Sequence, residues 1–400
     1  MNLPPAGPLP PPDADAARPV AGWYPDPFDP HRWRWFDGVS WTVVATPAAG
    51  AAAAQRRPRL PRWLSVPVLV CGVITVVALA VTAVSSPWAV VAGLVPLAIV
   101  LPALSWLDRV EPEPRASKVH AVAWGACVAI VVAGVANSTV GAAFGGVAAM
   151  IVSAPLVEEA VKGLGIVWAV RRREVDSVTD GVVYAGWVAI GFAVVEDISY
   201  FAVADLDGSF LVVFVLRALL TPFAHPLFTF WTGLAIGRAV FGGHSVWRAW
   251  WGFALAVVFH ALWNGSLVLA DVTYDVDEAA GAAVILVAMA LFLVEFLAVA
   301  VAVAVMRGRD RRRFVASIPA LVLRYDVGPD EAAMFVGGWR QLLRRRRRLD
   351  RSQRRAFDRL HASLARLSAR RDRPGGLDGD EERLLADRLS DAVRAFRAVS

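Results

Sequence analysis

The sequence has very few cysteines and lysines. Its two cysteines, Cys71 and Cys127, both lie in apolar stretches, so the chain has no disulfide framework and no CxxC motif. Lys118 and Lys162 are the two lysines in a chain that otherwise uses arginine. No HExxH or GxxxxGK[ST] sequence occurs, which excludes the zincin signature and the P-loop. Residues 1–20 have neither a basic start nor an apolar core, so we expect no cleavable signal peptide and insertion through the first membrane helix.

Apolar residues are abundant, at 57% of the chain, and they cluster in eight blocks. This composition is too apolar for a soluble domain of 400 residues. A helix needs about 20 apolar residues to cross a bilayer, and each block is long enough. We therefore predict an all-α polytopic membrane protein with about eight transmembrane helices. The blocks are residues 63–83, 88–107, 119–137, 139–170, 180–204, 210–241, 246–271 and 280–306.

Basic residues gather on alternate connections between these blocks. Positive residues mark the cytoplasmic side of a membrane protein, so this pattern predicts both termini in the cytoplasm. The basic connections lie at 56–62, 109–118, 171–173, 238–248 and 307–313. The connections without Lys or Arg lie at 85–87, 137–138, 205–207 and 271–278.

Composition divides the chain into five parts. These are a disordered Pro/Ala arm at 1–20, a small Trp-rich module at 21–45, a linker at 46–62, a transmembrane core at 63–313 with its motifs at 155–264, and a basic cytoplasmic helical tail at 314–400. In the module, Asp37-Gly38 suits a type I′ turn between short aromatic strands. The module resembles a short Trp-rich N-terminal domain of unknown function found ahead of many bacterial membrane proteins, and we expect the chain to lie in a bacterial inner membrane. The resemblance brings no known chemistry.

The C-terminal part of the chain is strongly basic. From Arg307 onward it has 24 arginines and 13 acidic residues, whereas the remainder carries a net charge of −5. Such a tail fits anionic lipid headgroups, or a solvated pair of amphipathic helices, and we expect no nucleic-acid partner. Pro374-Gly375-Gly376 predicts a break between two tail helices.

The fourth apolar block contains three ionisable residues. They are Glu158, Glu159 and Lys162, in the stretch Pro155-Leu-Val-Glu-Glu-Ala-Val-Lys162. Each such group costs about 2.5–3.5 kcal/mol at the centre of a bilayer, so these side chains need partners or water.

Other spans carry ionisable residues at the same depth. Counted at about 1.5 Å per residue, five residues lie roughly 17–22 Å from the cytoplasmic face: Glu158, Glu159, Glu196, His225 and His260. Lys162 and Asn264 follow Glu158 and His260 by one helical turn, on the same faces. Unrelated polar residues would scatter in depth. We therefore predict a polar cavity in mid-membrane, open to water from the cytoplasm.

These motifs resemble those of a known family. Glu158-Glu159-Ala-Val-Lys162, Phe192-Ala-Val-Val-Glu196-Asp197, a lone His225 and His260-Ala-Leu-Trp-Asn264 are similar, in this order, to the motifs of the PrsW family of intramembrane proteases. That family is a branch of the wider group that includes CAAX-processing and bacteriocin-immunity membrane proteases. The resemblance covers about 139–271. It implies hydrolysis of peptide bonds within a membrane-embedded protein substrate, which in parts of the family is a single-pass regulator such as an anti-sigma factor.

Paired glutamates in a low dielectric suit the activation of water. Repulsion and desolvation raise the pKa of one carboxyl group, so Glu158 or Glu159 is the expected base. His225 and His260 either ligate a metal such as Zn²⁺, with Glu196 as the most ligand-like carboxylate, or bind the substrate carbonyl directly. Asn264 then orients His260 or donates to the oxyanion, and Lys162 either compensates charge or takes part in catalysis.

Two other interpretations remain open. Carboxylates and histidines in mid-membrane also occur in cation or proton transporters, although the sequence shows no convincing internal repeat of the kind common in those proteins. A catalytically inactive scaffold that recruits partners through its terminal segments is the third interpretation, and it predicts tolerance of Glu159→Gln.

Overall fold

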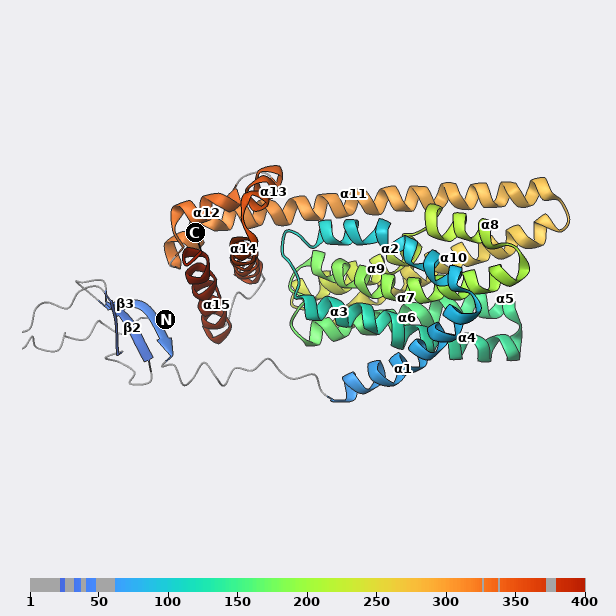
Figure 1. Ribbon diagram of the computed structural model, residues 1–400, viewed down its shortest axis with the longest axis horizontal. Coiled ribbons are helices and arrows are strands. Elements are labelled where there is room, and N and C mark those ends of the chain that lie inside the picture. The colour runs from blue at the N-terminus through green and yellow to red at the C-terminus, as the bar shows by residue number, and fades with distance from the viewer. Residues whose placement is uncertain are drawn as a thin grey trace, which may run out of the picture. The chain divides into compact units, whose positions relative to one another are not determined.

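The structure, a computed structural model, describes residues 22–25, 32–36, 41–47, 62–325, 327–336, 339–371 and 379–399 (Figure 1). The chain divides into two units, Met1–Pro61 and Arg62–Ser400, which are treated separately below. The predicted arm at 1–20 and the Asp37-Gly38 turn lie outside the described residues.

The N-terminal unit contains a three-stranded antiparallel sheet in the order β1-β2-β3. Its strands are β1 (Gly22–Pro25), β2 (Arg32–Phe36) and β3 (Trp41–Pro47). Phe36 of β2 pairs with Trp41 of β3. β1 adds a strand beyond this hairpin, with Trp23 opposite Trp35.

The second unit is helical. Its bundle consists of α1 (Arg62–Ser85), α2 (Pro87–Leu107), α3 (Arg115–Ala123), η1 (Trp124–Ala129), α4 (Ile130–Phe144), α5 (Gly146–Ala148), η2 (Ala149–Ser153), α6 (Ala154–Arg171), α7 (Val178–Asp207), α8 (Phe210–Phe214), η3 (Val215–Leu220), α9 (Ala224–Phe241), η4 (Val246–Ala249), α10 (Trp250–Tyr274) and α11 (Glu278–Arg324). The segments η1, η2 and η3 are π-helical turns within longer helices.

Seven helical segments of the described residues are long and apolar enough to cross a membrane. They are Val66–Ser85, Pro87–Leu107, Arg115–Phe144, Val178–Asp207, Phe210–Phe241, Val246–Tyr274 and Glu278–Val322. Together with the exposed valines and leucines on their outer faces, these segments confirm the predicted all-α polytopic architecture.

The fourth predicted block differs from the structure. Its expected bounds, 139–170, are wrong because α4 continues to Phe144 and the chain turns at Gly145, which has a φ of 90° that favours glycine. The helical run then extends from Gly146 to Arg171 through α5, η2 and α6. Every 18-residue stretch of this run contains Glu158, Glu159 and Lys162, so the run is absent from the seven apolar segments although its length is sufficient.

Helix α7 forms the centre of the bundle, between α2, α6 and α9 (Figure 1). It begins with a capping box in which Ser177 Oγ accepts from the Asp180 amide and Asp180 accepts from the Ser177 amide. It crosses α9 at close range, where a Cβ atom on Gly181 would lie 2.3 Å from the Gly233 carbonyl oxygen. Glycine therefore allows the two helices to approach closely enough to bring their polar residues together.

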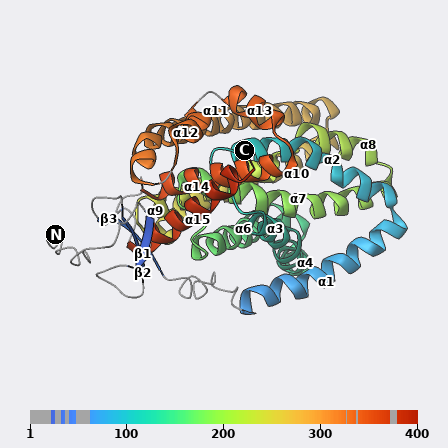
Figure 2. The ribbon, with the colours of Figure 1, turned by 60° about the vertical axis from the view of Figure 1, so that its left-hand side comes forward.

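Helix α11 is 47 residues long, so it extends well beyond its predicted end at residue 306. Its last part packs with α12 (Pro329–Val336), α13 (Trp339–Arg348), α14 (Arg351–Arg371) and α15 (Gly379–Arg397), which gather around it (Figure 2). This tail has its own apolar core, which includes Phe314, Phe335, Leu360 and Phe396. The predicted break at Pro374-Gly375-Gly376 lies outside the described residues, between α14 and α15.

Candidate active site

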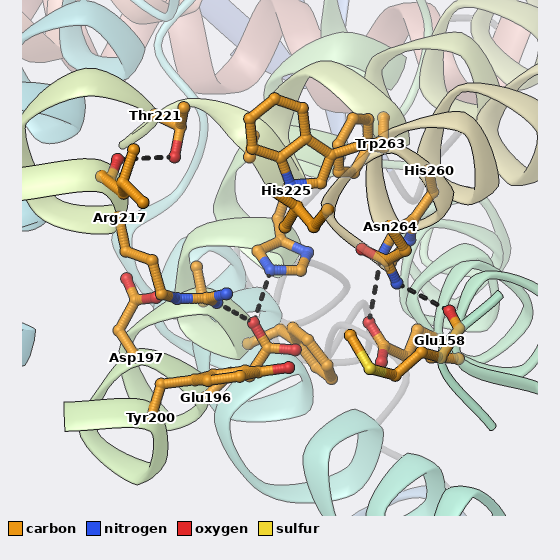
Figure 3. A pocket seen from close by; sticks show the side chains of 18 of the residues that line it. Glu158, Glu196, Asp197, Tyr200, Arg217, Thr221, His225, His260, Trp263 and Asn264 are labelled. Carbon is orange, nitrogen blue, oxygen red and sulfur yellow. Dashed lines mark hydrogen bonds and ion pairs between the residues drawn. The ribbon is translucent and has the colours of Figure 1, made fainter. Parts of the chain in front are cut away.

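Four helices bring the predicted polar residues together inside the bundle (Figure 3). They are Glu158, Glu159 and Lys162 on α6, Glu196 on α7, His225 on α9 and His260 on α10. All except the half-buried Glu196 are buried. The hydrogen bonds described below join all six side chains in one network.

The Lys162 ammonium lies at the centre of this network. Its Nζ atom is 2.9 Å from Glu159 Oε1, 3.3 Å from Glu158 Oε2 and 3.0 Å from His225 Nδ1. It also lies 4.0 Å from the centre of the Phe192 ring, a cation–π contact. An ammonium has three N–H donors, and here each donor has an acceptor when His225 Nδ1 carries no proton. Lys162 therefore supplies the positive charge that the glutamate pair requires.

Glu159 is fully buried, and both of its oxygens have partners. Oε2 accepts from Thr229 Oγ1 at 2.8 Å, and Oε1 lies 2.9 Å from Lys162 Nζ and 3.2 Å from His260 Nδ1. A His260 ring with its proton on Nδ1 donates to this carboxylate, which leaves Nε2 as an acceptor. Glu159 thus fixes the positions of Lys162 and His260.

Glu158 has weaker contacts and faces a cavity. Asn137 Nδ2 donates to its Oε1 at 3.4 Å, and Lys162 lies 3.3 Å from its Oε2. His260 Nε2 is 3.9 Å from the same Oε2 atom, too far for a direct hydrogen bond. A water molecule that contacts both atoms fits this separation.

Arg217 on η3 holds the other side of the network (Figure 3). Its guanidinium donates to Glu196 and, at 2.6 Å, to Asp197, and it lies 4.0 Å from the centre of the Tyr200 ring. Glu196 Oε2 in turn lies 2.8 Å from His225 Nε2. A neutral His225 therefore donates to Glu196 through Nε2 and accepts from Lys162 through Nδ1, so both of its ring nitrogens have partners.

A cavity of about 570 Å³ adjoins Glu158, Glu196, His225 and His260. Its wall comes from α4, η2, α6, α7, α8, η3, α9, α10 and α11. The lining on α10 and α11 runs from His260 toward the connection at 275–277, and no lining residue belongs to the arginine-flanked connections 108–114, 172–177 and 242–245. The cavity therefore lies toward the ends of the helices whose connections lack Lys and Arg, whereas the sequence predicted an opening at the arginine-flanked end. On that side the apolar cluster that includes Val183, Phe230 and Leu234 fills the bundle.

Asn264 lies in the cavity wall one turn beyond His260, but its hydrogen bond is directed away from that histidine. Its Nδ2 atom donates to the Met150 carbonyl oxygen at 2.9 Å, which ties α10 to the π-helical turn η2. Asn137, which the sequence placed in a connection, instead lies within α4 next to Glu158 and accepts from Ser153 Oγ at 2.8 Å.

Sequence reasoning missed the contacts of Asn137, Thr229 and Arg217. Arg217 was detectable, because an arginine within an apolar span needs a partner and Glu196 and Asp197 are carboxylates in the interior of the preceding apolar span. Asn137 and Thr229 are neutral, and neutral polar residues are common in membrane helices, so no sequence signal distinguished them.

The donor atoms of Glu158, His225 and His260 lie within 4.8 Å of one another, a candidate set of metal ligands. Lys162 Nζ, however, is within 3.3 Å of two of these three residues, and His225 has no ring nitrogen left for a metal. A divalent cation at about 2.1 Å from these ligands would face a buried ammonium. In this arrangement the residues do not fit a metal ion, and Glu196 is bound by Arg217 and His225 instead.

Comparisons with known proteins agree with the motifs. The sequence model described as "PrsW family intramembrane metalloprotease" matches residues 113–317, and a model for a protein of unknown function, DUF2510, matches residues 21–54. The chain is 31% identical to "Protease PrsW" of Geobacillus kaustophilus (strain HTA426) over 118 residues. That alignment covers 29% of this chain and 50% of the relative, so the chain spans about half the length of the curated relative it matches. No solved structure matches the chain.

The PrsW match covers slightly more than half of the chain and contains every residue of the network. With its apolar helices and its clustered motif residues, the chain is a multi-pass membrane protein that belongs to the PrsW family of intramembrane proteases.

Proposed function

We propose that the protein is an intramembrane endopeptidase that hydrolyses peptide bonds of membrane-embedded proteins with a water molecule activated by Glu158. The observation that carries this proposal is the 3.9 Å separation between Glu158 Oε2 and His260 Nε2 at the wall of the cavity. Both atoms can contact one water molecule there.

Glu158 is the better general base of the two glutamates. Glu159 has partners on both oxygens and does not line the cavity, whereas Glu158 lines it and has only longer contacts. Glu158 takes a proton from the water as its oxygen attacks the substrate carbonyl carbon, and it later returns that proton to the leaving amine. General-base catalysis of this kind contributes about 10²–10⁴-fold in rate.

The other residues position this pair. His260 accepts a hydrogen bond from the water through Nε2, because its Nδ1 proton is directed to Glu159. Asn264 uses one N–H for Met150, and we assign the second to the oxyanion of the tetrahedral intermediate. Lys162 keeps Glu159 ionised, and Arg217 with Glu196 holds His225 against Lys162. No step passes through a metal.

The position of the cavity indicates how a substrate reaches Glu158. Its wall runs from the motif residues toward the connections 145 and 275–277, so a substrate segment reaches Glu158 from that end or from the surrounding lipid. We infer that the substrates are single-pass regulatory membrane proteins, such as anti-sigma factors, which can place an extended segment in a cavity of this size.

We place the protein in a bacterial inner membrane with both termini in the cytoplasm, as the distribution of arginines indicates. The tail then lies at the cytoplasmic surface, where we propose that α13 binds anionic lipid headgroups. Arg344, Arg345, Arg347 and Arg348 are exposed on this helix, and Arg311 of α11 donates to the Phe335 carbonyl oxygen just before it. That contact keeps α13 close to the end of the membrane-spanning part of α11.

The decisive experiment compares the wild type with Glu158→Gln, Glu159→Gln and His260→Ala, in detergent and in liposomes, on single-pass candidate substrates. We expect Glu158→Gln to fold normally and to lose cleavage by about 10²-fold or more. Glu159→Gln should lose stability as well, because Thr229, Lys162 and His260 all bind this carboxylate. Full cleavage by Glu158→Gln would refute the mechanism. Ion flux that depends on Glu196, without cleavage by the wild type, would favour the transporter instead.

A further inference from the structure

The connection between α6 and α7 joins the helix of Glu158 to the helix of Glu196, and its backbone is strained. Helix α6 ends in a Schellman motif, with the Arg173 amide donating to Val170 O at 2.9 Å and the Glu174 amide donating to Ala169 O at 3.0 Å. Arg173 has a φ of 55°, in the left-handed region where glycine is usual. For a residue with a side chain, this backbone conformation is less favourable by about 1–2 kcal/mol. Other contacts must therefore stabilise the connection.

Arg370 of the tail helix α14 provides such contacts. Its guanidinium donates to the Arg173 carbonyl oxygen, to the Asp176 carboxylate and, at 2.7 Å, to Glu381 Oε1. The side chain is buried, with 6% of its surface exposed. One arginine thus binds two points of the α6–α7 connection and one point of α15.

The charge of Arg370 matters because the connection is crowded with carboxylates. Carboxylate oxygens of Asp176, Asp180 and Glu111 lie within 4.8 Å of one another, and Asp180 is part of the capping box at the start of α7. Burial raises the pKa of Glu111 well above its usual range, and the carboxylates of Asp176 and Asp180 raise it further. Without Arg370, the buried Asp176 would lose its ion pair and face its acidic neighbours.

Neighbouring contacts attach α14 firmly to the bundle. Arg366, one turn before Arg370, lies 4.0 Å from Glu113, which accepts a hydrogen bond from Tyr184 of α7 at 2.9 Å. Ser317 of α11 donates to Ser368 at 2.7 Å, and Leu360 and Leu364 of α14 belong to the apolar core of the tail. A shift of α14 would therefore disturb these contacts near the ends of α6 and α7.

We propose that Arg370 is a positioning residue of the proposed endopeptidase: through it the tail clamps the α6–α7 connection and sets the offset of Glu158 on α6 relative to Glu196 on α7. The inference rests on the proposed function. The tail is then required for full activity. Any event that loosens α14 lowers the activity of the site in the middle of the bundle.

The test uses the full chain with Arg370→Gln, and with Arg359→Gln as the matched control, because Arg359 is an exposed arginine of the same helix. We expect Arg370→Gln to lower kcat by about 10- to 100-fold, the range for a small misplacement of catalytic groups, with KM within about twofold. If Arg370 acts through Asp176, the double variant with Asp176→Asn should lose no more than Arg370→Gln alone.

A second readout needs no substrate. Spin labels at Leu164→Cys on α6 and Val203→Cys on α7, two exposed positions, report the distance between these helices once Cys71 and Cys127 are replaced by alanine. Arg370→Gln should shift or broaden the distance distribution, and Arg359→Gln should not. An unchanged distribution in Arg370→Gln would overturn the clamp, as would an unchanged kcat with faster hydrogen exchange in the tail alone. A shifted distribution in Arg370→Gln, together with a wild type that cleaves no substrate, would support the clamp and refute the endopeptidase.

Discussion

Lys162 Nζ lies 3.0 Å from His225 Nδ1, so this ammonium occupies the face of the histidine that a metal ion would need. The contact explains why His225 is neutral in this arrangement, since an imidazolium cannot accept a hydrogen bond from an ammonium. It also makes the lysine and a divalent cation mutually exclusive occupants of the site.

Removal of the ammonium should therefore create a metal site. We expect Lys162→Gln to bind Zn²⁺ through Glu158, His225 and His260, and the wild type to contain no stoichiometric metal, as measured by elemental analysis after purification. The variant should also be destabilised by about 3–5 kcal/mol without metal, because two buried carboxylates lose their counter-charge. A wild type that holds one zinc ion per chain, and loses cleavage on chelation, would contradict this prediction.

Arg217 should be required for the integrity of the site. Arg217→Gln leaves the carboxylates of Glu196 and Asp197 without their shared cation, so we expect a loss of about 3–5 kcal/mol in stability and a loss of cleavage. Arg217→Lys should retain part of the stability and part of the cleavage, because it keeps the positive charge. It should not retain all of either, because an ammonium cannot bridge the two carboxylates as a guanidinium does. Thermal unfolding in detergent measures the effect, with the exposed Arg309→Gln as control. Equal stability of Arg217→Gln and Arg309→Gln would refute the bridge.

The crossing of α7 and α9 should tolerate no side chain at its closest point. In Gly181→Ala the new Cβ would lie 2.3 Å from the Gly233 carbonyl oxygen, so the helices must separate. Such overpacking costs about 1–3 kcal/mol, and it should also reduce cleavage because Glu196 and His225 lie on these two helices. Gly146→Ala is the control, since nothing lies within 4 Å of its added Cβ. The prediction fails if both alanine variants unfold at the same temperature as the wild type.

The tail should become less stable in acid because of His361. Burial, and then the charge of Arg311, lower the pKa of His361 to about 4, while Asp358 opposes this shift. The unfolded tail takes up a proton as the pH falls below about 6.5, and the folded tail does so only near 4. Between these values the stability of the tail should fall by up to about 3 kcal/mol.

The measurement for His361 is hydrogen exchange of α14 at pH 7 and pH 4.5, in the wild type and in His361→Phe. A phenylalanine keeps the stacking on Phe335, whose ring lies nearly parallel to that of His361. The difference between the two proteins isolates the histidine, because Glu111 and Glu113 titrate in both. An equal response to acid in the two proteins would show that His361 does not cause the effect.

Much of the architecture could be predicted from the sequence, because apolar length and the distribution of arginines are strong signals. The network of Glu158, Glu159, Glu196, His225 and His260 could be anticipated for a related reason: a charged side chain inside a membrane needs partners, and these residues shared one depth. The position of Lys162 in that network followed from its spacing on α6.

Other features depend on contacts that no local pattern contains. The turn at Gly145 was missed because the residues on both sides are equally apolar, so hydropathy gave no boundary there. The direction of the cavity depends on how the cluster around Phe230 and Leu234 packs, and packing of this kind is not periodic in sequence. The clamp by Arg370 joins residues nearly 200 positions apart, and Arg370 is one of many arginines in the tail.

The π-helical turns at Trp124–Ala129, Ala149–Ser153 and Val215–Leu220 affect how this family should be aligned. A π-helical turn corresponds to one extra residue in an α-helix, so each turn rotates the rest of its helix by about 100°. Relatives that lack a turn should align with a single-residue gap at that place, and a gap of this kind preserves the side-chain register of the motif that follows. Alignments that forbid gaps within membrane helices would therefore displace Glu158 or Arg217 from their counterparts.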